Sequence, residues 1–325
     1  MKDSSATYSF VVPIYNDGRL AERFCVEFER VFREYLACEA IEGQVELIFV
    51  NDGSVDDSIE LLRKLAGNFP FVRVIDLSRN FGQHLALSCG YKHASGDYVG
   101  MLNVDQQDPP SQIPKLLDLI RSGDADVVYG LRIQRNDPAI NRWTSRLFTQ
   151  VLNKLTGYDT PLNISTLRVM SRRFVDAYDQ LTEKSRYLPG LEMWMGFKKD
   201  YTPITHQERE EGTSSYTFRR RLLFALSAIV SFSDLPLKFA VVTGTLVAAV
   251  GFLLTAFLIL QKLFFLEIQP GYTTTVSLIV FLGGVQILFI GLASLYIGRV
   301  LREVQNRPAW IVRDTYNFGS VRESR

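Results

Sequence analysis

GDYVGMLNVDQQDPPSQIP, residues 96–114, is the stretch that decides the fold. Its apolar run, residues 98–104, has the length and composition of a buried strand. The run ends in DQQD, residues 105–108, so carboxylate and amide side chains follow the strand directly, and two prolines come next. Such an ending is typical of a parallel sheet that binds a ligand at the carboxyl ends of its strands. In isolation the segment also suits a plain turn, because Asp and Pro are common turn formers.

The first 131 residues alternate between strand-like and helix-like segments. Runs rich in β-branched residues predict strands at 8–14, 45–50, 72–77, 98–104 and 126–131, and helical periodicity predicts helices at 20–36, 55–66, 83–94 and 111–121. This alternation indicates a mainly parallel α/β sheet. The polar side chains at the strand ends would then meet at one edge of the sheet; they are Asn16, Asp17, Asn51, Asp52, Arg79, Asn80, Asp105 and Gln107.

Acids, amides and one arginine at a single edge suggest a site for a nucleotide and a divalent cation. Asp105 and Gln107 lie two residues apart in a non-helical segment, so both side chains can point to one side. Their oxygen atoms suit Mg²⁺ or Mn²⁺ better than zinc, and such a cation would neutralise a diphosphate. Neither a P-loop nor a G-x-G-x-x-G segment follows the first strand, which argues against an ATPase or a dinucleotide-binding protein.

Composition and cysteine content narrow the class of protein further. The chain has 325 residues, 47% of them hydrophobic, and a formal net charge of +1, so no basic excess indicates nucleic-acid binding. Cys25, Cys38 and Cys89 have neither metal-site nor disulfide-framework spacing, which fits a reducing compartment. Residues 1–10 lead straight into a strand pattern, and we expect no secretory signal there.

Two long apolar runs predict a transmembrane hairpin over residues 237–300. Residues 239–260 carry no charge over 22 positions, and residues 276–297 contain only Gln286 as a strongly polar side chain. At 1.5 Å per residue each run reaches about 33 Å, which is enough to cross a bilayer core. A buried helical hairpin of a soluble protein is the alternative.

Charge around the hairpin predicts its orientation. Basic residues precede the first run and follow the second, whereas the connecting loop has Lys262 alone, so the positive-inside rule places the amino-terminal domain and both termini in the cytosol. Residues 215–236 form a juxtamembrane segment with a basic start and an apolar face, which suits an interfacial helix or a packed helix of the soluble domain. Residues 301–325 are expected to form a cytosolic tail.

Several segments together resemble one known family. These segments are VVPIYND, FVNDGSVDDS, LSRNFGQHLALSCGYKHASGDYV, VDQQDPP, DVVYGLRIQR, SRRFVDA and FLGGVQILFIGLASLYIGRVLREVQNRP. They are similar to family 2 glycosyltransferases that act on polyprenyl phosphates, which include bactoprenol glucosyltransferases and dolichol-phosphate-mannose synthases. The resemblance covers nearly the whole chain. It implies a cytosolic GT-A domain over residues 1–214, a nucleotide-sugar donor, Mg²⁺ or Mn²⁺, an isoprenoid phosphate acceptor and a homo-oligomer.

The resemblance also assigns roles to residues of this chain. Asp17 stands where a glutamate is usual, and Asn103 stands where the metal motif usually begins with an acid, which removes one negative charge. The nucleotide loop would comprise Pro13, Tyr15 and Asp17; Asp52 would contact the base or ribose; Arg79 and Asn80 would flank the donor beside Asn103; and Asp105 and Gln107 would contact the metal.

Two further departures from the family concern the chemistry. Thr166 stands in the place of an acidic residue, and Ser215 replaces a lysine in the segment 209–216. A missing general base is tolerable, because a phosphate monoester has its second pKa near 6 and is already a nucleophilic dianion at neutral pH. The leaving nucleoside diphosphate would be stabilised by the metal at Asp105 and by arginines drawn from Arg132, Arg135, Arg168 and Arg209.

The expected function is therefore an inverting, metal-dependent transfer of a sugar to polyprenyl phosphate, in particular undecaprenyl phosphate, at the cytoplasmic face of the inner membrane. Its product would be a lipid-linked sugar for cell-envelope glycans. A sugar-lipid binding or assembly protein with impaired catalysis is the alternative, to which Asn103, Thr166 and Ser215 point. A processive synthase is disfavoured because no Gln-x-x-Arg-Trp segment is present, and a transporter would need more spans than two per chain.

Overall fold

The computed structural model describes residues 6–37, 43–132, 161, 163–184, 186, 188–205, 235–264 and 271–318. The chain divides into two compact units. The first, here called the sheet unit, comprises Met1–Asn153, Tyr158–Thr217 and Pro308–Arg325. The second, here called the helical unit, comprises Lys154–Gly157 and Phe218–Arg307. Each unit is described by itself.

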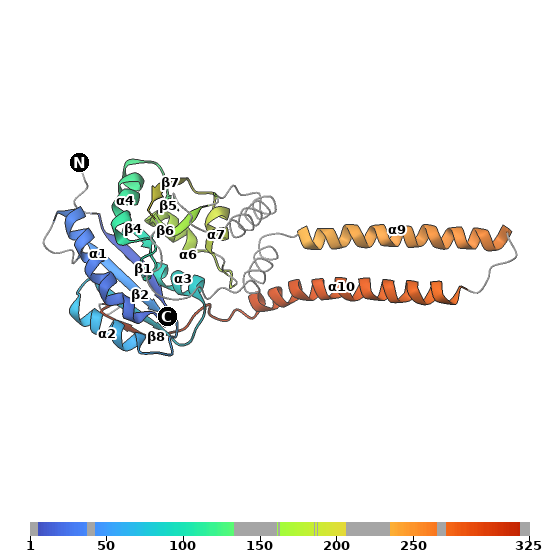
Figure 1. Cartoon of the computed structure of the whole chain (residues 1–325), viewed down its shortest axis with the longest axis horizontal. Helices are drawn as coiled ribbons and strands as arrows, with labels where there is room; N and C mark the ends of the chain where they lie inside the picture. The colour runs from blue at the N-terminus through green and yellow to red at the C-terminus, as the bar shows by residue number, and fades with distance from the viewer. Residues whose placement is uncertain are drawn as a thin grey trace. The chain divides into compact units, whose positions relative to one another are not determined.

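Within the described residues, the sheet unit contains one 8-stranded sheet with the order β7-β5-β6-β4-β1-β2-β3-β8 (Figure 1). Its centre is formed by parallel strands β1 (Tyr8–Ile14), β2 (Val45–Asn51), β3 (Val72–Leu77) and β4 (Tyr98–Met101). The predicted parallel α/β sheet is therefore confirmed. Because the four strands are neighbours and run the same way, the loops at their carboxyl ends lie along one edge.

Strand β4 is shorter than the sequence predicts. It ends at Met101, and although the backbone N–H of Leu102 still donates to the carbonyl of Val11 at 3.1 Å, residues 104 and 105 already form a turn. Gln106 then takes a left-handed backbone conformation with φ of 54°. The oxygen-bearing residues thus lie in a loop beyond the strand.

The outer strands were not all predicted. β5 (Val127–Arg132) was expected, but β6 (Ile164–Ser171), which runs antiparallel to β4 and β5, and β7 (Lys199–Ile204), parallel to β5, were not. β8 (Val312–Tyr316) pairs antiparallel with β3 and closes the other edge. The segment 301–325, expected as a cytosolic tail, therefore contains a strand of the sheet unit.

Helices cover both faces of the sheet. Helix α1 (Ala21–Leu36), together with α2 (Ser58–Asn68) and α4 (Ile113–Ser122), contributes side chains to the core on the face of Phe10. Helix α3 (Gln83–His93) packs on the opposite face, where Gly90 contacts Val11. Helix α6 (Arg172–Asp179) lies against α3, and α7 (Leu188–Trp194) follows it along the chain.

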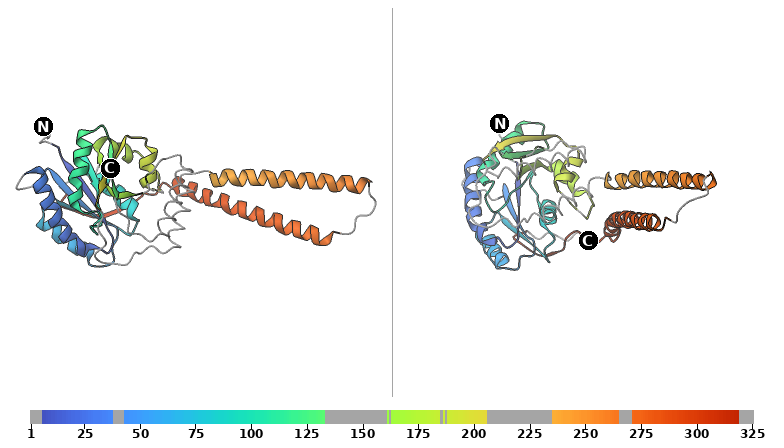
Figure 2. Two further views of the ribbon diagram at one scale, coloured as in Figure 1. Left: turned by 45° about the horizontal axis from the view of Figure 1, so that its top comes forward. Right: turned by 45° about the vertical axis from the view of Figure 1, so that its right-hand side comes forward.

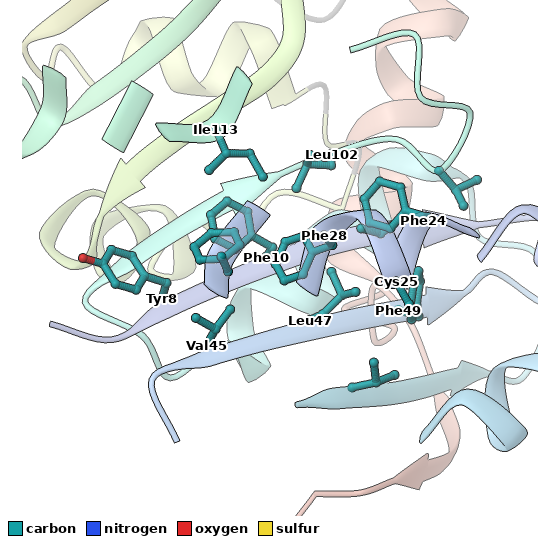
Figure 3. Packing of buried hydrophobic residues seen from close by; sticks show 14 of the residues in the cluster. Tyr8, Phe10, Phe24, Cys25, Phe28, Val45, Leu47, Phe49, Leu102 and Ile113 are labelled. Carbon is teal, nitrogen blue, oxygen red and sulfur yellow. The ribbon is translucent and has the colours of Figure 1, made fainter. Parts of the chain in front are cut away.

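The core is built on aromatic side chains at helical spacing. Phe24, Phe28 and Phe32 recur every four residues along α1, so they form one stripe, and all three are fully buried. The ring of Phe10 in β1 packs against Phe28 (Figure 3), with a centroid distance of 5.4 Å. The ring of Phe28 lies 4.7 Å from that of Phe32. This packing fixes α1 on the sheet and thereby holds β1 and its loop.

The helical unit contains two long helices, α9 (Leu235–Phe264) and α10 (Tyr272–Val304), of 30 and 33 residues. They lie side by side as a hairpin (Figure 2), and a Cβ atom at Gly244 would meet the Phe289 ring at 3.3 Å. Large apolar side chains on both helices are exposed, for example Phe252 at 74% and Ile287 at 73%. Among the described residues, one stretch, Phe281–Val304, is long and apolar enough to cross a membrane, and Ala240–Leu253 is a shorter apolar helix.

Candidate functional site

The loop after β1 is fastened to the loop after β2. Asn16 has a positive φ of 58°, and its backbone N–H donates to Ser54 Oγ at 3.0 Å, while its side-chain Oδ1 accepts from the N–H of Val55 at 3.0 Å. Tyr15 is 46% exposed, so its ring is available to a ligand. Pro13 and Asp17 lie in the same stretch, Pro13 near the end of β1 and Asp17 just before a short 3₁₀ helix.

Asp52 organises the loop after β3. The residue is only 3% exposed, and its two carboxylate oxygens accept the backbone N–H groups of Phe81 at 2.7 Å and Gly82 at 2.9 Å. Burial raises the pKa of Asp52, although these two N–H groups and the charge of Arg79 oppose the rise. In this structure Asp52 therefore shapes the loop of Arg79 and Asn80, a role that the sequence alone did not indicate.

Gly53 allows these two loops to approach each other. It has a φ of 63°, and a Cβ atom there would lie 2.2 Å from the carbonyl carbon of Arg79 and 2.5 Å from the backbone nitrogen of Asn80. Only glycine fits both the conformation and the space. The side chain of Arg79 is exposed and lies over the ring of Phe81, with its guanidinium carbon 4.0 Å from the ring centroid. Arg79 and Asn80 thus lie at the rim of the strand edge.

Asp105 and Gln107 lie in the turn after β4, as expected. The backbone N–H of Gln107 donates to Asp105 Oδ1 at 3.3 Å, and both residues are partly exposed. Their oxygen atoms fit a hard divalent cation, and Mg²⁺ is commonly held by one or two protein carboxylates together with substrate phosphates and water. No group of three or more His, Cys, Asp or Glu side chains suited to a metal occurs within the described residues. The residues present thus fit a cation that takes its other ligands from a bound phosphate group and water.

Asn103 and Thr166 are brought together across the sheet. The amide nitrogen of Asn103 donates to Thr166 Oγ1 at 3.0 Å, and the amide nitrogen of Gln83 in turn donates to Asn103 Oδ1 at 3.3 Å. Asn103 and Thr166, the two positions where the resembling family has an acidic residue, are therefore hydrogen-bonded to each other. The pair is neutral, so this part of the site has fewer negative charges than the family pattern would give.

Asp108 is a residue of the site that sequence analysis did not single out. Its carboxylate is 4% exposed, and Oδ2 accepts from Arg132 Nη2 at 2.9 Å and from the hydroxyl of Ser165. Thr166 Oγ1 lies 3.4 Å from the same oxygen. Asp108 thus joins the β4 loop to β5 and β6. A carboxylate immediately before Pro-Pro was visible in the sequence, but its partners lie 24 or more positions away along the chain.

Arg132 was expected to face a phosphate, but in this structure it already has a carboxylate partner. Its guanidinium group pairs with Asp108, and its side chain is 22% exposed. An arginine held by a buried carboxylate loses little conformational freedom when it binds a second anion. The expected contact with the leaving diphosphate remains a prediction, now with Asp108 as the partner that orients the side chain.

Arg168 differs from the expectation that it faces the substrate. It is 5% exposed, and its Nη1 atom forms an ion pair with Glu192 at 2.5 Å, to which the hydroxyl of Tyr129 also donates at 2.9 Å. Burial alone would lower the pKa of Arg168, but the carboxylate of Glu192 together with the hydroxyls of Tyr91 and Tyr129 outweighs burial, so the pKa is raised above its usual value. The alternation of β6 explains the position, because it turns Arg168 into the interior beneath α3. Arg168, Glu192 and Tyr129 thus link β6, α7 and β5.

Some expected residues lie outside the described part of the chain. Arg135, Arg209 and Ser215 belong to this group, as does most of the juxtamembrane segment 215–236. The site described above consequently rests on four loops and on β5 and β6.

The mainly parallel sheet, with polar loops at the carboxyl ends of its central strands, is typical of α/β domains that bind a ligand at this edge. Residues 9–179 match the family model of glycosyl transferase family 2. The chain belongs to this family and is a glycosyltransferase.

Curated relatives cover the chain almost completely. It is 32% identical over 316 residues to an uncharacterized glycosyltransferase, YkcC, of Bacillus subtilis, covering 97% of this chain and 96% of the relative. It is 35% identical over 309 residues to a prophage-derived bactoprenol glucosyl transferase of Shigella flexneri, covering 95% of this chain and 98% of the relative.

Solved structures that resemble this chain include two further enzymes. A glucosyl-3-phosphoglycerate synthase from Mycobacterium tuberculosis is 17% identical, with 71% of this chain and 81% of that chain covered and a TM-score of 0.47. A mannosyltransferase from Pyrobaculum calidifontis, solved in complex with GDP-Man and Mn²⁺, is 15% identical, with 89% and 88% covered and a TM-score of 0.43.

Proposed function

We propose that this glycosyltransferase moves a sugar from a nucleotide-sugar donor to the phosphate of a polyprenyl phosphate, in particular undecaprenyl phosphate. The observation that carries the proposal is the similarity to a bactoprenol glucosyl transferase over 95% of this chain, which includes the two long helices as well as the sheet unit. Similarity limited to the sheet unit, where we place the donor, would not support a proposal about the acceptor. The product would be a lipid-linked sugar for the assembly or modification of cell-envelope glycans.

The helical unit supports a membrane-bound acceptor. Exposed large apolar side chains along α9 and α10 are unfavourable in water and favourable in a lipid bilayer. The segments on both sides of the hairpin, β7 and β8, belong to the same sheet unit. Since one compact unit lies on one side of a membrane, the hairpin between them must cross an even number of times. We therefore propose a two-pass inner-membrane protein with the sheet unit and both termini in the cytosol.

The chemistry we propose is a single displacement at the anomeric carbon. An oxygen of the acceptor phosphate forms the new bond to that carbon, while the bond from the carbon to the nucleoside diphosphate breaks and its electron pair leaves with the diphosphate. One displacement inverts the anomeric centre. The acceptor is already dianionic near neutral pH, so Thr166 in the place of an acid does not prevent the reaction.

The described residues divide into donor-binding and charge-stabilising groups. Tyr15, Asp17 and the loop of Arg79 and Asn80 would hold the nucleotide, with Asp52 shaping that loop. Arg132, oriented by Asp108, would stabilise charge on the leaving diphosphate. Mg²⁺ or Mn²⁺ bound at Asp105 and Gln107 would neutralise the diphosphate. A homo-oligomer is part of the proposal, because it would bury part of the exposed apolar surface of α9 and α10.

The test is acceptor-dependent turnover by the full-length protein in detergent. A panel of UDP-, GDP- and dTDP-sugars is supplied with Mg²⁺ or Mn²⁺, with and without undecaprenyl phosphate, and nucleoside diphosphate release is measured. We expect release from one donor to depend on the lipid. Release from no donor, by protein that still binds nucleotide and lipid, would instead favour a sugar-lipid binding protein, for which the neutral Asn103–Thr166 pair is the supporting observation.

A further inference from the structure

Strand β8 carries Arg313, which contacts β3 directly before the loop of Arg79 and Asn80. The strand lies at the edge of the sheet (Figure 1). It pairs antiparallel with β3, so Arg313 lies beside the last residues of β3. The Arg313 Nη1 atom lies 3.5 Å from Asp76 Oδ2, and Nη2 donates to the carbonyl of Ser78 at 2.7 Å. Arg313 therefore contacts β3 at two points, one buried and one at the start of the loop that carries Arg79.

The first contact leads to the loop after β2. The carboxylate of Asp76 is 2% exposed, and a buried carboxylate requires partners that satisfy its charge. Its partners are Arg313 and the side-chain amide of Asn51, which donates to Asp76 Oδ1 at 2.7 Å. The other end of the Asn51 amide, Oδ1, accepts the backbone N–H of Ser54 at 3.3 Å. Arg313, Asp76 and Asn51 thus form a chain of contacts that ends on the backbone of the second loop.

The second contact leads to the loop after β3. Residues at the start of β8 hold the backbone of Ser78 from both sides. The N–H of Ser78 donates to the carbonyl of Ile311, the residue before β8, at 2.9 Å, and the carbonyl of Ser78 accepts from Arg313 of β8. Arg79 and Asn80 follow immediately. The same loop is fixed at its far end by Asp52, which accepts the N–H groups of Phe81 and Gly82.

We infer that Arg313 is a positioning residue for donor binding: through Asp76 and Asn51, and through Ser78, it holds the two loops that meet at Gly53 in their binding geometry. Arg313 makes no contact with the proposed reacting atoms and acts through these residues. Its effect therefore falls on the affinity for the donor and leaves the bond-forming step nearly unchanged. The inference about loop order stands on the structure alone, and only its effect on donor affinity rests on the proposed function.

Hydrogen exchange in the full-length protein in detergent tests the positioning without any substrate. Arg313→Ala is expected to accelerate exchange of the backbone amides of Ser54, Phe81 and Gly82 on the order of tenfold, in line with couplings measured between linked sites. Arg313→Lys keeps one charge beside Asp76 but cannot serve Asp76 and Ser78 with a planar fork, so it should recover only part of the protection. Unchanged exchange at the three amides in Arg313→Ala would overturn the inference.

Two matched variants separate positioning from general effects. Arg307→Ala removes an equal charge outside β8 and should leave the three amides at wild-type values. Asn317→Ala removes the donation to the carbonyls of Pro70 and Val72 at the other end of β8, away from Asp76, and should also leave them unchanged. If Asn317→Ala accelerated exchange as much as Arg313→Ala, loss of β8 docking in general would explain the result and the specific role of Arg313 would be wrong.

The kinetic measurement separates this inference from the proposed function. With a donor identified by the panel above, Arg313→Ala should raise KM for the donor about tenfold while kcat changes less than about twofold. A fall in kcat at unchanged KM would contradict positioning of the donor. Should no donor support turnover, the proposed function fails, and the exchange experiment still decides whether Arg313 orders the loops.

Discussion

Asp105 is the residue on which the proposed chemistry depends most directly. It offers a carboxylate in the turn after β4, two positions before Gln107, where a divalent cation would meet the donor diphosphate. Asp105→Ala is expected to lower turnover by at least about a hundredfold, because charge stabilisation in the transition state is lost. The protein should remain folded, since the carboxylate is partly exposed. Nucleoside diphosphate release and the unfolding temperature measure the two effects.

The matched control for this prediction is Asp124→Ala. The Asp124 side chain is 91% exposed and forms a surface ion pair with Lys198, so its removal should leave activity unchanged. Near-normal activity of Asp105→Ala at saturating metal would show that the cation, if used, is held elsewhere.

At the residue scale, the sequence identified strand-end residues but not their mutual contacts. Asp105, Gln107 and Asn80 could be found because polar residues followed apolar runs. Asp108 could not be assigned a role, because its partners Arg132 and Ser165 come from strands far along the chain. Arg168 was misplaced for a related reason: its family position was known, but the direction of its side chain depends on the pairing of β6 with β4 and β5.

At the element scale, helix α3 makes stability dependent on pH. His84 lies in its first turn, largely buried and close to Arg168, and burial followed by that charge lowers its pKa from 6.5 to about 4. The folded protein therefore keeps this imidazole neutral, whereas the unfolded chain takes up a proton below about pH 6.5. Stability is retained above pH 6.5 and is lost as the pH falls towards 4.

The variant His84→Gln should weaken this acid sensitivity. Between pH 7.5 and pH 4.5 the wild-type protein should lose on the order of 2–3 kcal/mol through this group, and the variant should lose correspondingly less. The unfolding temperature at the two pH values measures the difference. His93→Gln, which removes the other histidine of α3, is the control. Equal acid sensitivity of wild type and His84→Gln would contradict the assignment.

Strands with a continuous apolar run could be predicted from the sequence. Strands that form only by pairing with a distant segment could not. β1 and β3 were predicted at their observed bounds, because their apolar runs are buried in the middle of the sheet. β8 reads VRDTY, a polar sequence with little strand signal of its own, and becomes a strand by pairing with β3. An edge strand has one neighbour, and whether such a segment forms a strand depends mostly on its pairing partner and less on its own sequence.

At the scale of the whole molecule, the return of β8 to the sheet unit leads to a test of the proposed two-pass membrane topology. A cysteine introduced at Gly271, before α10, is expected to react with a membrane-impermeant thiol reagent in intact cells, whereas one at Gln305, after α10, should react only in permeabilised cells. Cys25 and Cys89 are buried, and a Cys38→Ser background removes the remaining thiol. Equal reactivity of the two positions in intact cells would contradict a two-pass hairpin.

The proposed function is transfer of a sugar to a lipid phosphate, and the mass of the lipid fraction tests this proposal most directly. Full-length protein is incubated with undecaprenyl phosphate, Mg²⁺ or Mn²⁺ and each nucleotide sugar, and the extracted lipid is examined by mass spectrometry beside the Asp105→Ala variant. We predict that wild-type protein adds one sugar to the lipid phosphate with one donor and that the variant adds none. Lipid of unchanged mass with every donor, from folded protein that binds both substrates, would contradict the proposed transfer.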